Sequence, residues 1–230
     1  MDRKERIGKI IDQVIESFVL DFLKAPYDYT LERDIHGQFY HRLLSHEDSY
    51  VFEEPYMLLH LEYPHDNILK GKSRGNVDLV ILEPDEGIDT LKSSSGGYNK
   101  DQRKMYAFEF KLNANGKAAV EGFHNDTAKL GGCEGSITML FLFLRDKTYT
   151  VNGKRNESVL FERLINKSEG FEVGRYPDRI YYVNAQTDAG KCVGESEWYR
   201  EACDAHVFER GGVYVYTQDR HDIEVLEAMG

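Results

Sequence analysis

Residues 105–112 read MYAFEFKL, and this short stretch decides the interpretation of the fold. Side chains in a β-strand alternate between the two faces of a sheet. The apolar residues at the even positions of this stretch therefore share one face, whereas Glu109 and Lys111 share the other with Ala107. Because burying an unpaired charge is costly, the two charged side chains predict either a mutual ion pair or a bound ligand.

The preceding strand adds a second carboxylate. Residues 76–82 read NVDLVIL and predict a strand with Asp78 in its interior, although Asp is a poor strand former. If the two strands pair, we expect Asp78 and Glu109 to converge on one hard cation. Two carboxylates, a backbone carbonyl and water suit Mg²⁺, and the Phe110 carbonyl is the candidate backbone ligand. Lys111 is expected to orient an attacking water and to stabilise negative charge.

Hydrophobic periodicity predicts the other elements. In chain order these are helices 5–24 and 31–44, strands 56–63, 76–82 and 105–112, helix 117–130 and strand 136–144. Beyond residue 150 we expect a helix over 157–167, a loop over 185–200, and strands over 179–184 and 213–217. We therefore predict one α/β domain over residues 1–230, with three layers and a central mixed β-sheet. Its core spans about 31–144, preceded by the helix 5–24 and followed by an extension over 150–230.

Asp78 and the triplet Glu109-Phe110-Lys111 resemble the motif of the PD-(D/E)XK nuclease superfamily, which has the restriction-endonuclease-like fold. In that family an Asp on the second core strand is followed, on the third strand, by an acidic residue, any residue and Lys. The family core runs helix, three strands, helix, strand (αβββαβ), the order predicted here. The chain departs in having Val77 before the Asp, where the motif has Pro. The resemblance implies a Mg²⁺- or Mn²⁺-dependent nuclease that hydrolyses phosphodiester bonds in DNA.

Many family members also carry a Glu on the first core helix that points to the metal site. Glu32 fits that position, because it lies three and seven residues before the apolar residues Ile35 and Phe39 and so on their inward face. By this resemblance, Glu32 joins Asp78 and Glu109 as a residue that supports the metal or its water.

Several further polar residues are secondary candidates. Glu62 ends the first predicted strand, where it is either a further ligand or an exposed carboxylate. His124, Asp126 and Lys129 lie on the helix after the third strand, which in similar nucleases borders the site; they contact water or phosphate, or form a solvated helix face. Six basic residues flank the catalytic strands. They either provide local positive charge that binds a phosphate backbone or are solvated loop charges. These residues are Lys70, Lys72, Arg74, Lys100, Arg103 and Lys104.

Composition restricts the partners and the compartment. The formal net charge of −11 argues against a protein that coats nucleic acid through overall charge. Three widely spaced cysteines without a CxxC motif favour a reducing cytoplasm, and the longest apolar run, residues 137–144, is too short to span a membrane. The histidines at 36, 41 and 46 are five residues apart, which does not keep them on one helix face and argues against a zinc site. We expect a cytoplasmic protein with a nucleic acid partner, as a homodimer or with a recruiting protein.

Two alternatives remain open from the sequence. The first is a catalytically inactive module on the same fold that binds nucleic acid or protein, since a fold does not fix a function. The second is an unrelated α/β protein in which Glu109 and Lys111 merely pair with each other. The distance between the Asp78 and Glu109 carboxylates separates these alternatives from the nuclease.

Overall fold

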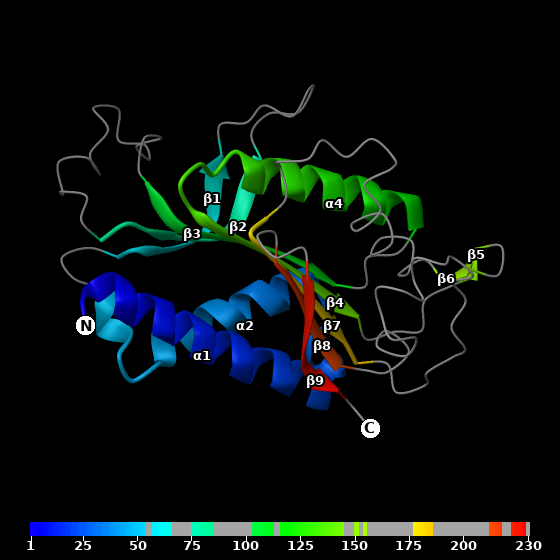
Figure 1. Cartoon of the computed structure of the whole chain (residues 1–230), viewed down its shortest axis with the longest axis horizontal. Coiled ribbons are helices and arrows are strands. Elements are labelled where there is room, and N and C mark those ends of the chain that lie inside the picture. The colour runs from blue at the N-terminus through cyan, green and yellow to red at the C-terminus, as the bar shows by residue number, and fades with distance from the viewer. Residues whose placement is uncertain are drawn as a thin grey trace.

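The computed structural model describes residues 1–53, 57–65, 75–84, 103–112, 116–144, 150–151, 154–155, 177–185, 212–217 and 222–228. A seven-stranded mixed sheet forms its centre, with α1 and α2 on one face and α4 on the other (Figure 1). The elements are α1 (Arg3–Lys24), η1 (Pro26–Asp28), α2 (Glu32–Ser45), η2 (Ser49–Phe52), β1 (Leu59–His65), β2 (Gly75–Leu82), β3 (Lys104–Leu112), α4 (Gly116–Gly131), β4 (Ile137–Leu144), β5 (Thr150–Val151), β6 (Lys154–Arg155), β7 (Arg179–Asn184), β8 (Gly212–Thr217) and β9 (Asp222–Ala228).

The sheet has the strand order β1-β2-β3-β4-β7-β8-β9. Strands β1, β2 and β3 are antiparallel neighbours, β4 returns through α4 to lie parallel to β3, and β7 lies parallel to β4. These five strands form the mixed part of the sheet, and β8 and β9 extend it in antiparallel fashion. The predicted α/β class, the mixed sheet with flanking helices, and the strands over 179–184 and 213–217 are confirmed. The expected helix 157–167 lies outside the described residues, and so does the expected loop 185–200 apart from its first residue.

The first strand differs from its predicted bounds of 56–63. It begins at Leu59 and continues through Pro64 to His65. Proline lacks an N–H and is excluded from central strands, but it is tolerated on an edge strand. Since β1 is the outermost strand on its side of the described sheet, Pro64 does not end it.

The sequence determines where helix α1 begins and which of its faces is buried. Asp2 caps its N-terminus by accepting a hydrogen bond from the Glu5 N–H at 2.8 Å, and the Glu5 side chain accepts from the Asp2 N–H at 3.0 Å. Such a reciprocal capping box satisfies two N–H groups that the helix leaves unpaired. Its apolar stripe from Ile7 to Leu23 is buried in the core. Among the described residues, no helix combines the length and the apolar character that a membrane span needs.

An aromatic cluster joins the two N-terminal helices to the sheet. Phe39 of α2 is fully buried, and its ring centroid lies 5.3 to 5.9 Å from those of Phe108, Phe110 and Phe141. It also meets Phe18 of α1 at 5.4 Å. The aromatic face of β3 is therefore the face that packs against α1 and α2, as strand alternation predicts.

Replacing Phe39 with alanine is expected to lower the free energy of unfolding by about 3 to 5 kcal/mol, because it removes a buried ring and leaves a cavity. Urea unfolding followed by circular dichroism measures this loss. Tyr50→Ala is the control, since Tyr50 is an aromatic residue that is 53% exposed, and it should cost less than about 1 kcal/mol. Equal losses in the two variants would contradict the central position of Phe39.

Candidate metal centre

Asp78 lies where the pairing of β2 with β3 ends. The register of the two strands runs from Ile81↔Tyr106 to Leu79↔Phe108, and its continuation by one residue would bring Asp78 opposite Glu109. There the Asp78 Oδ2 atom accepts a hydrogen bond from the Phe110 N–H at 2.9 Å. The side-chain carboxylate thus replaces the backbone carbonyl that a continued ladder would offer. This bond fixes Asp78 and uses one of its two oxygens.

Glu62 stands opposite Asp78 on the other side, in β1. The β1–β2 register pairs Leu61 with Leu79 and Tyr63 with Val77, which leaves Glu62 facing Asp78. Glu62 has φ 50°, a left-handed conformation that non-glycine residues adopt rarely and at a cost. Like charges directly opposite each other on neighbouring strands are destabilising. Glu62 and Asp78 therefore bring two carboxylates together, and the Asp78 carboxylate also raises the pKa of Glu109, so a cation at this point would offset negative charge on all three residues.

Glu109 is the most completely buried carboxylate of the site, with 0% of its surface exposed. Its Oε1 atom forms an ion pair with Lys129 Nζ of α4 at 2.6 Å. Its Oε2 atom has no hydrogen-bond partner among the described residues. Burial raises the pKa of Glu109, the Asp78 and Asp126 carboxylates raise it further, and Lys129 lowers it less, so this pKa lies well above the ordinary value.

Asp126 of α4 bridges the two lysines of the site. Its Oδ2 lies 3.0 Å from Lys111 Nζ and its Oδ1 lies 2.9 Å from Lys129 Nζ. Lys111 Nζ also contacts Glu32 Oε1 of α2 at 3.0 Å. Burial lowers the pKa of Lys111, but the Asp126 and Glu32 carboxylates together raise it above its ordinary value. The predicted residues at positions 32, 109, 111, 126 and 129 thus form one connected network, in which Lys111 links α2, β3 and α4.

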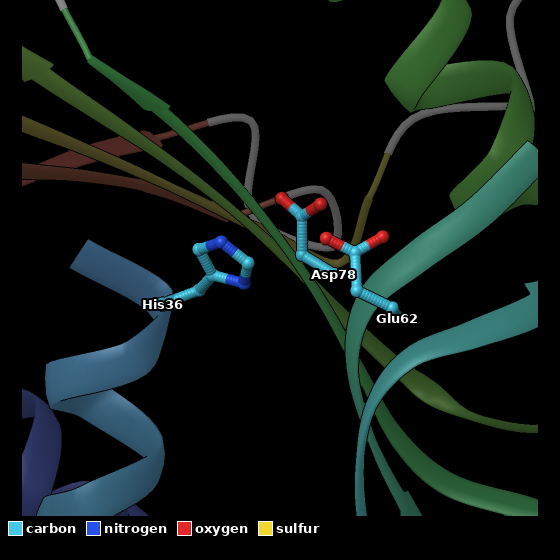
Figure 2. A group of neighbouring side chains, drawn as sticks. All are labelled: His36, Glu62 and Asp78. Atoms are coloured by element: carbon cyan, nitrogen blue, oxygen red, sulfur yellow. The ribbon is translucent and has the colours of Figure 1, made fainter. Parts of the chain in front are cut away.

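Sequence reasoning missed His36 of α2. The ligand atoms of His36, Glu62 and Asp78 all lie within 4.8 Å of one another. Figure 2 shows the His36 ring facing the Asp78 and Glu62 carboxylates. The ring is 6% exposed, and its Nδ1 atom has no partner in the part of the chain that the structure describes. The missed signal was its spacing of four residues from Glu32, which puts both on the same side of the helix.

The donor set fits a divalent cation. With every group ionised, the site holds five carboxylates (Glu32, Glu62, Asp78, Glu109 and Asp126) and two ammonium groups (Lys111 and Lys129), which leaves a net charge of −3. Carboxylate oxygens are the ligands of Mg²⁺ and Mn²⁺, and an imidazole nitrogen favours transition metals. The unpartnered Oε2 of Glu109 and Nδ1 of His36 are buried atoms that a cation would satisfy.

Some predicted residues cannot be placed at the site. Lys70, Lys72, Arg74 and Lys100 lie outside the described residues, as does the side chain of His124. Lys104 lies at the start of β3, with its Nζ 5.5 Å from the centroid of the Tyr63 ring. The suggested contacts of these residues with phosphate, and the substrate contacts of Asp126 and Lys129, stay predictions. The structure does place the Asp126 carboxylate and the Lys129 ammonium inside the ion-pair network rather than on a solvated helix face.

In the metal-free protein, stability is expected to fall as pH rises from 4.5, the ordinary pKa of Glu, towards neutrality. Above 4.5 the folded protein holds a larger fraction of a proton on Glu109 than the unfolded chain does, because the pKa of Glu109 is raised in the folded state. The unfolded state then binds fewer protons, so the free energy of unfolding decreases with pH. Urea unfolding in EDTA at several pH values measures this slope, and Glu109→Gln should flatten it. An unchanged slope in the variant would contradict the raised pKa.

No family model, curated protein or solved structure matches the chain.

Proposed function

We propose that the chain is a metal-dependent nuclease that hydrolyses phosphodiester bonds in DNA. The observation that carries the proposal is the fully buried Glu109 carboxylate beside Asp78, with one oxygen lacking any partner among the described residues. Burying such a group is costly unless it binds something, and a hard cation is its natural partner. The order of α2, β1, β2, β3, α4 and β4 and the motif at Asp78, Glu109 and Lys111 give independent support.

Asp78, Glu109 and the Phe110 carbonyl would hold Mg²⁺ or Mn²⁺ in this proposal, and His36 and Glu62 would complete the ligand set. When bound, such an ion supplies Lewis acidity towards a phosphate and lowers the pKa of a coordinated water. The imidazole of His36 favours Mn²⁺ over Mg²⁺ as the more effective ion.

Lys111 would provide the positive charge next to the reacting phosphate. Its ammonium is held between Glu32 and Asp126, at 3.0 Å from each, and 19% of its side chain is exposed. A fixed and partly desolvated charge stabilises negative charge developing in a transition state better than a mobile one, because no reorganisation is needed. Glu32 and Asp126 therefore act as positioning residues for Lys111.

The DNA would reach the site in spite of a net charge of −11. Phosphate contacts fix nucleic acid on a protein surface and need local, not overall, positive charge. A homodimer or a recruiting protein that holds the substrate is compatible with this charge.

Asp78→Asn is expected to lower cleavage at least about a hundredfold, because a ligand worth several kcal/mol of charge stabilisation is lost. The assay incubates the protein with plasmid, single-stranded DNA or RNA in Mg²⁺, Mn²⁺ or EDTA. Asp12→Asn is the control, since Asp12 is an exposed carboxylate of α1 that pairs with Arg179 at 3.5 Å. Cleavage that survives in Asp78→Asn would refute the assignment. Metal binding without cleavage of any substrate would favour the inactive binding module.

A further inference from the structure

The Lys129 ammonium is surrounded by oxygen atoms. Its Nζ lies 2.6 Å from Glu109 Oε1, 2.9 Å from Asp126 Oδ1 and 3.1 Å from the carbonyl oxygen of Asn76. These three contacts come from β3, α4 and β2, and the Lys129 side chain is 12% exposed. Three oxygens from three separate elements make a cage for a single positive charge.

This cage has the composition of a hard-metal site. Two carboxylates and a backbone carbonyl are the ligands that Mg²⁺ and Mn²⁺ take in proteins. The aliphatic part of the Lys129 side chain, its stem, passes close to Gly75. A Cβ atom added at Gly75 would lie 3.2 Å from the Lys129 Cδ. A side chain at position 75 would therefore press on the stem that carries the ammonium into the cage.

We propose that Lys129 is an internal cation that competes with the divalent metal for Glu109, so that it determines how tightly the site binds metal. This inference rests on the proposed function, because it assumes a metal at Asp78 and Glu109. In the metal-free protein the ammonium neutralises part of the buried negative charge. When the metal binds Glu109, the Lys129 ammonium moves away from that carboxylate. The metal and the ammonium then no longer lie against the same group.

The competition follows from Coulomb's law. Two cations sharing one buried carboxylate repel each other strongly, because the effective dielectric constant inside a protein is far below that of water. Lys129 keeps Asp126 as a partner when it leaves Glu109, so its release does not strand an unpaired ammonium. Lys111 has a different position, since its contacts are with Glu32 and Asp126.

The first test measures Mn²⁺ binding to the full chain by isothermal titration calorimetry. Lys129→Met is expected to bind Mn²⁺ about tenfold more tightly than the wild type, the equivalent of about one pKa unit of interaction. Lys129→Gln, which keeps hydrogen-bond donors for the two carboxylates, should behave in the same way and serves if the Met variant is unstable. Lys24→Met removes the same charge at an exposed position of α1 and should leave the affinity unchanged. Unchanged or weaker binding in both Lys129 variants would overturn the proposal.

The second test follows the ammonium itself. Acetylation of lysines by acetic anhydride, quantified by mass spectrometry, should label Lys129 several-fold faster in saturating Mn²⁺ than in EDTA. Lys111 should stay protected in both conditions, and Lys24, whose side chain is 75% exposed, should react in both. Mn²⁺ binding with no change at Lys129 would overturn the competition and leave the nuclease proposal standing. An absence of Mn²⁺ binding in the wild type and in both variants would overturn the two proposals together.

Discussion

Glu109→Gln is expected to abolish metal-dependent cleavage and at the same time to make the metal-free protein more stable. Cleavage should fall at least about a hundredfold, because a neutral amide is a poor ligand for a hard cation. The free energy of unfolding in EDTA near neutral pH should rise by about 1 kcal/mol or more. The reason is that burial and the neighbouring Asp78 and Asp126 carboxylates raise the pKa of Glu109, so its charged form is held at a cost that a neutral amide does not carry, while Lys129 keeps Asp126 as a partner.

The opposite signs of the two effects make this variant informative. A residue that served only the core would lose stability and activity together. Glu16→Gln is the matched control, since Glu16 is an exposed carboxylate of α1, and neither property should change. Mn²⁺ should raise the melting temperature of the wild type and of this control but not of Glu109→Gln. A destabilised Glu109→Gln that still responds to Mn²⁺ would show that Glu109 is a structural ion-pair partner of Lys129.

Asp126→Asn is expected to lower the free energy of unfolding by about 3 kcal/mol. The Asp126 carboxylate is 4% exposed and carries two ion pairs, at 3.0 Å to Lys111 and 2.9 Å to Lys129. Removing one member of a buried pair costs about 3 to 5 kcal/mol, because it leaves buried charge uncompensated. Each lysine keeps a second carboxylate, Glu32 or Glu109, so the lower end of this range is expected. Urea unfolding in EDTA measures the loss.

Asp21→Asn is a closely matched control for Asp126→Asn. Asp21 also contacts two cations, Arg42 at 2.8 Å and Lys24 at 3.7 Å, but its side chain is 46% exposed. Exposed pairs contribute little, because water screens them, so this variant should lose less than about 1 kcal/mol. If the two substitutions cost the same, burial of the network would not determine its energy, and the account of Asp126 as a bridge between buried lysines would be wrong.

Sequence reasoning predicted the strands of the site and the face on which its charges lie. The alternation of side chains along residues 105–112 predicts that Glu109 and Lys111 share one face, and the structure places both against α4. The expected convergence of Asp78 and Glu109 depends on pairing of the second and third strands, and β2 does pair with β3. Family resemblance and helix periodicity predict Glu32 as a residue that supports the metal; the structure places it in contact with Lys111, and its role towards a metal stays a prediction. These features depend on local alternation, which a sequence encodes directly.

The partners of the charges could not be predicted, because they come from elements far apart in the chain. Glu109 pairs with Lys129, twenty residues later, and Lys111 pairs with Glu32, 79 residues earlier. Such pairings depend on the tilt of α4 and α2 against the sheet, which no periodicity reports. The five-residue spacing of the three histidines argues against a shared site, whereas the four-residue spacing of His36 from Glu32 places both on one side of α2. The substrate could not be predicted for a similar reason, because its identity depends on the shape and charge of a protein surface. Strand alternation does not determine these properties.

The left-handed conformation of Glu62 has a consequence for association between molecules. Strand β1 is the outer strand of the sheet among the described residues. A regular, flat edge of this kind is a template on which a strand of another chain can add, and this is a common route to aggregation. At Glu62, a positive φ turns the backbone out of the regular strand, and the side chain places a negative charge at the same point. The residue that faces Asp78 therefore gives this edge both an irregular backbone and a negative charge, two features that disfavour pairing with another strand.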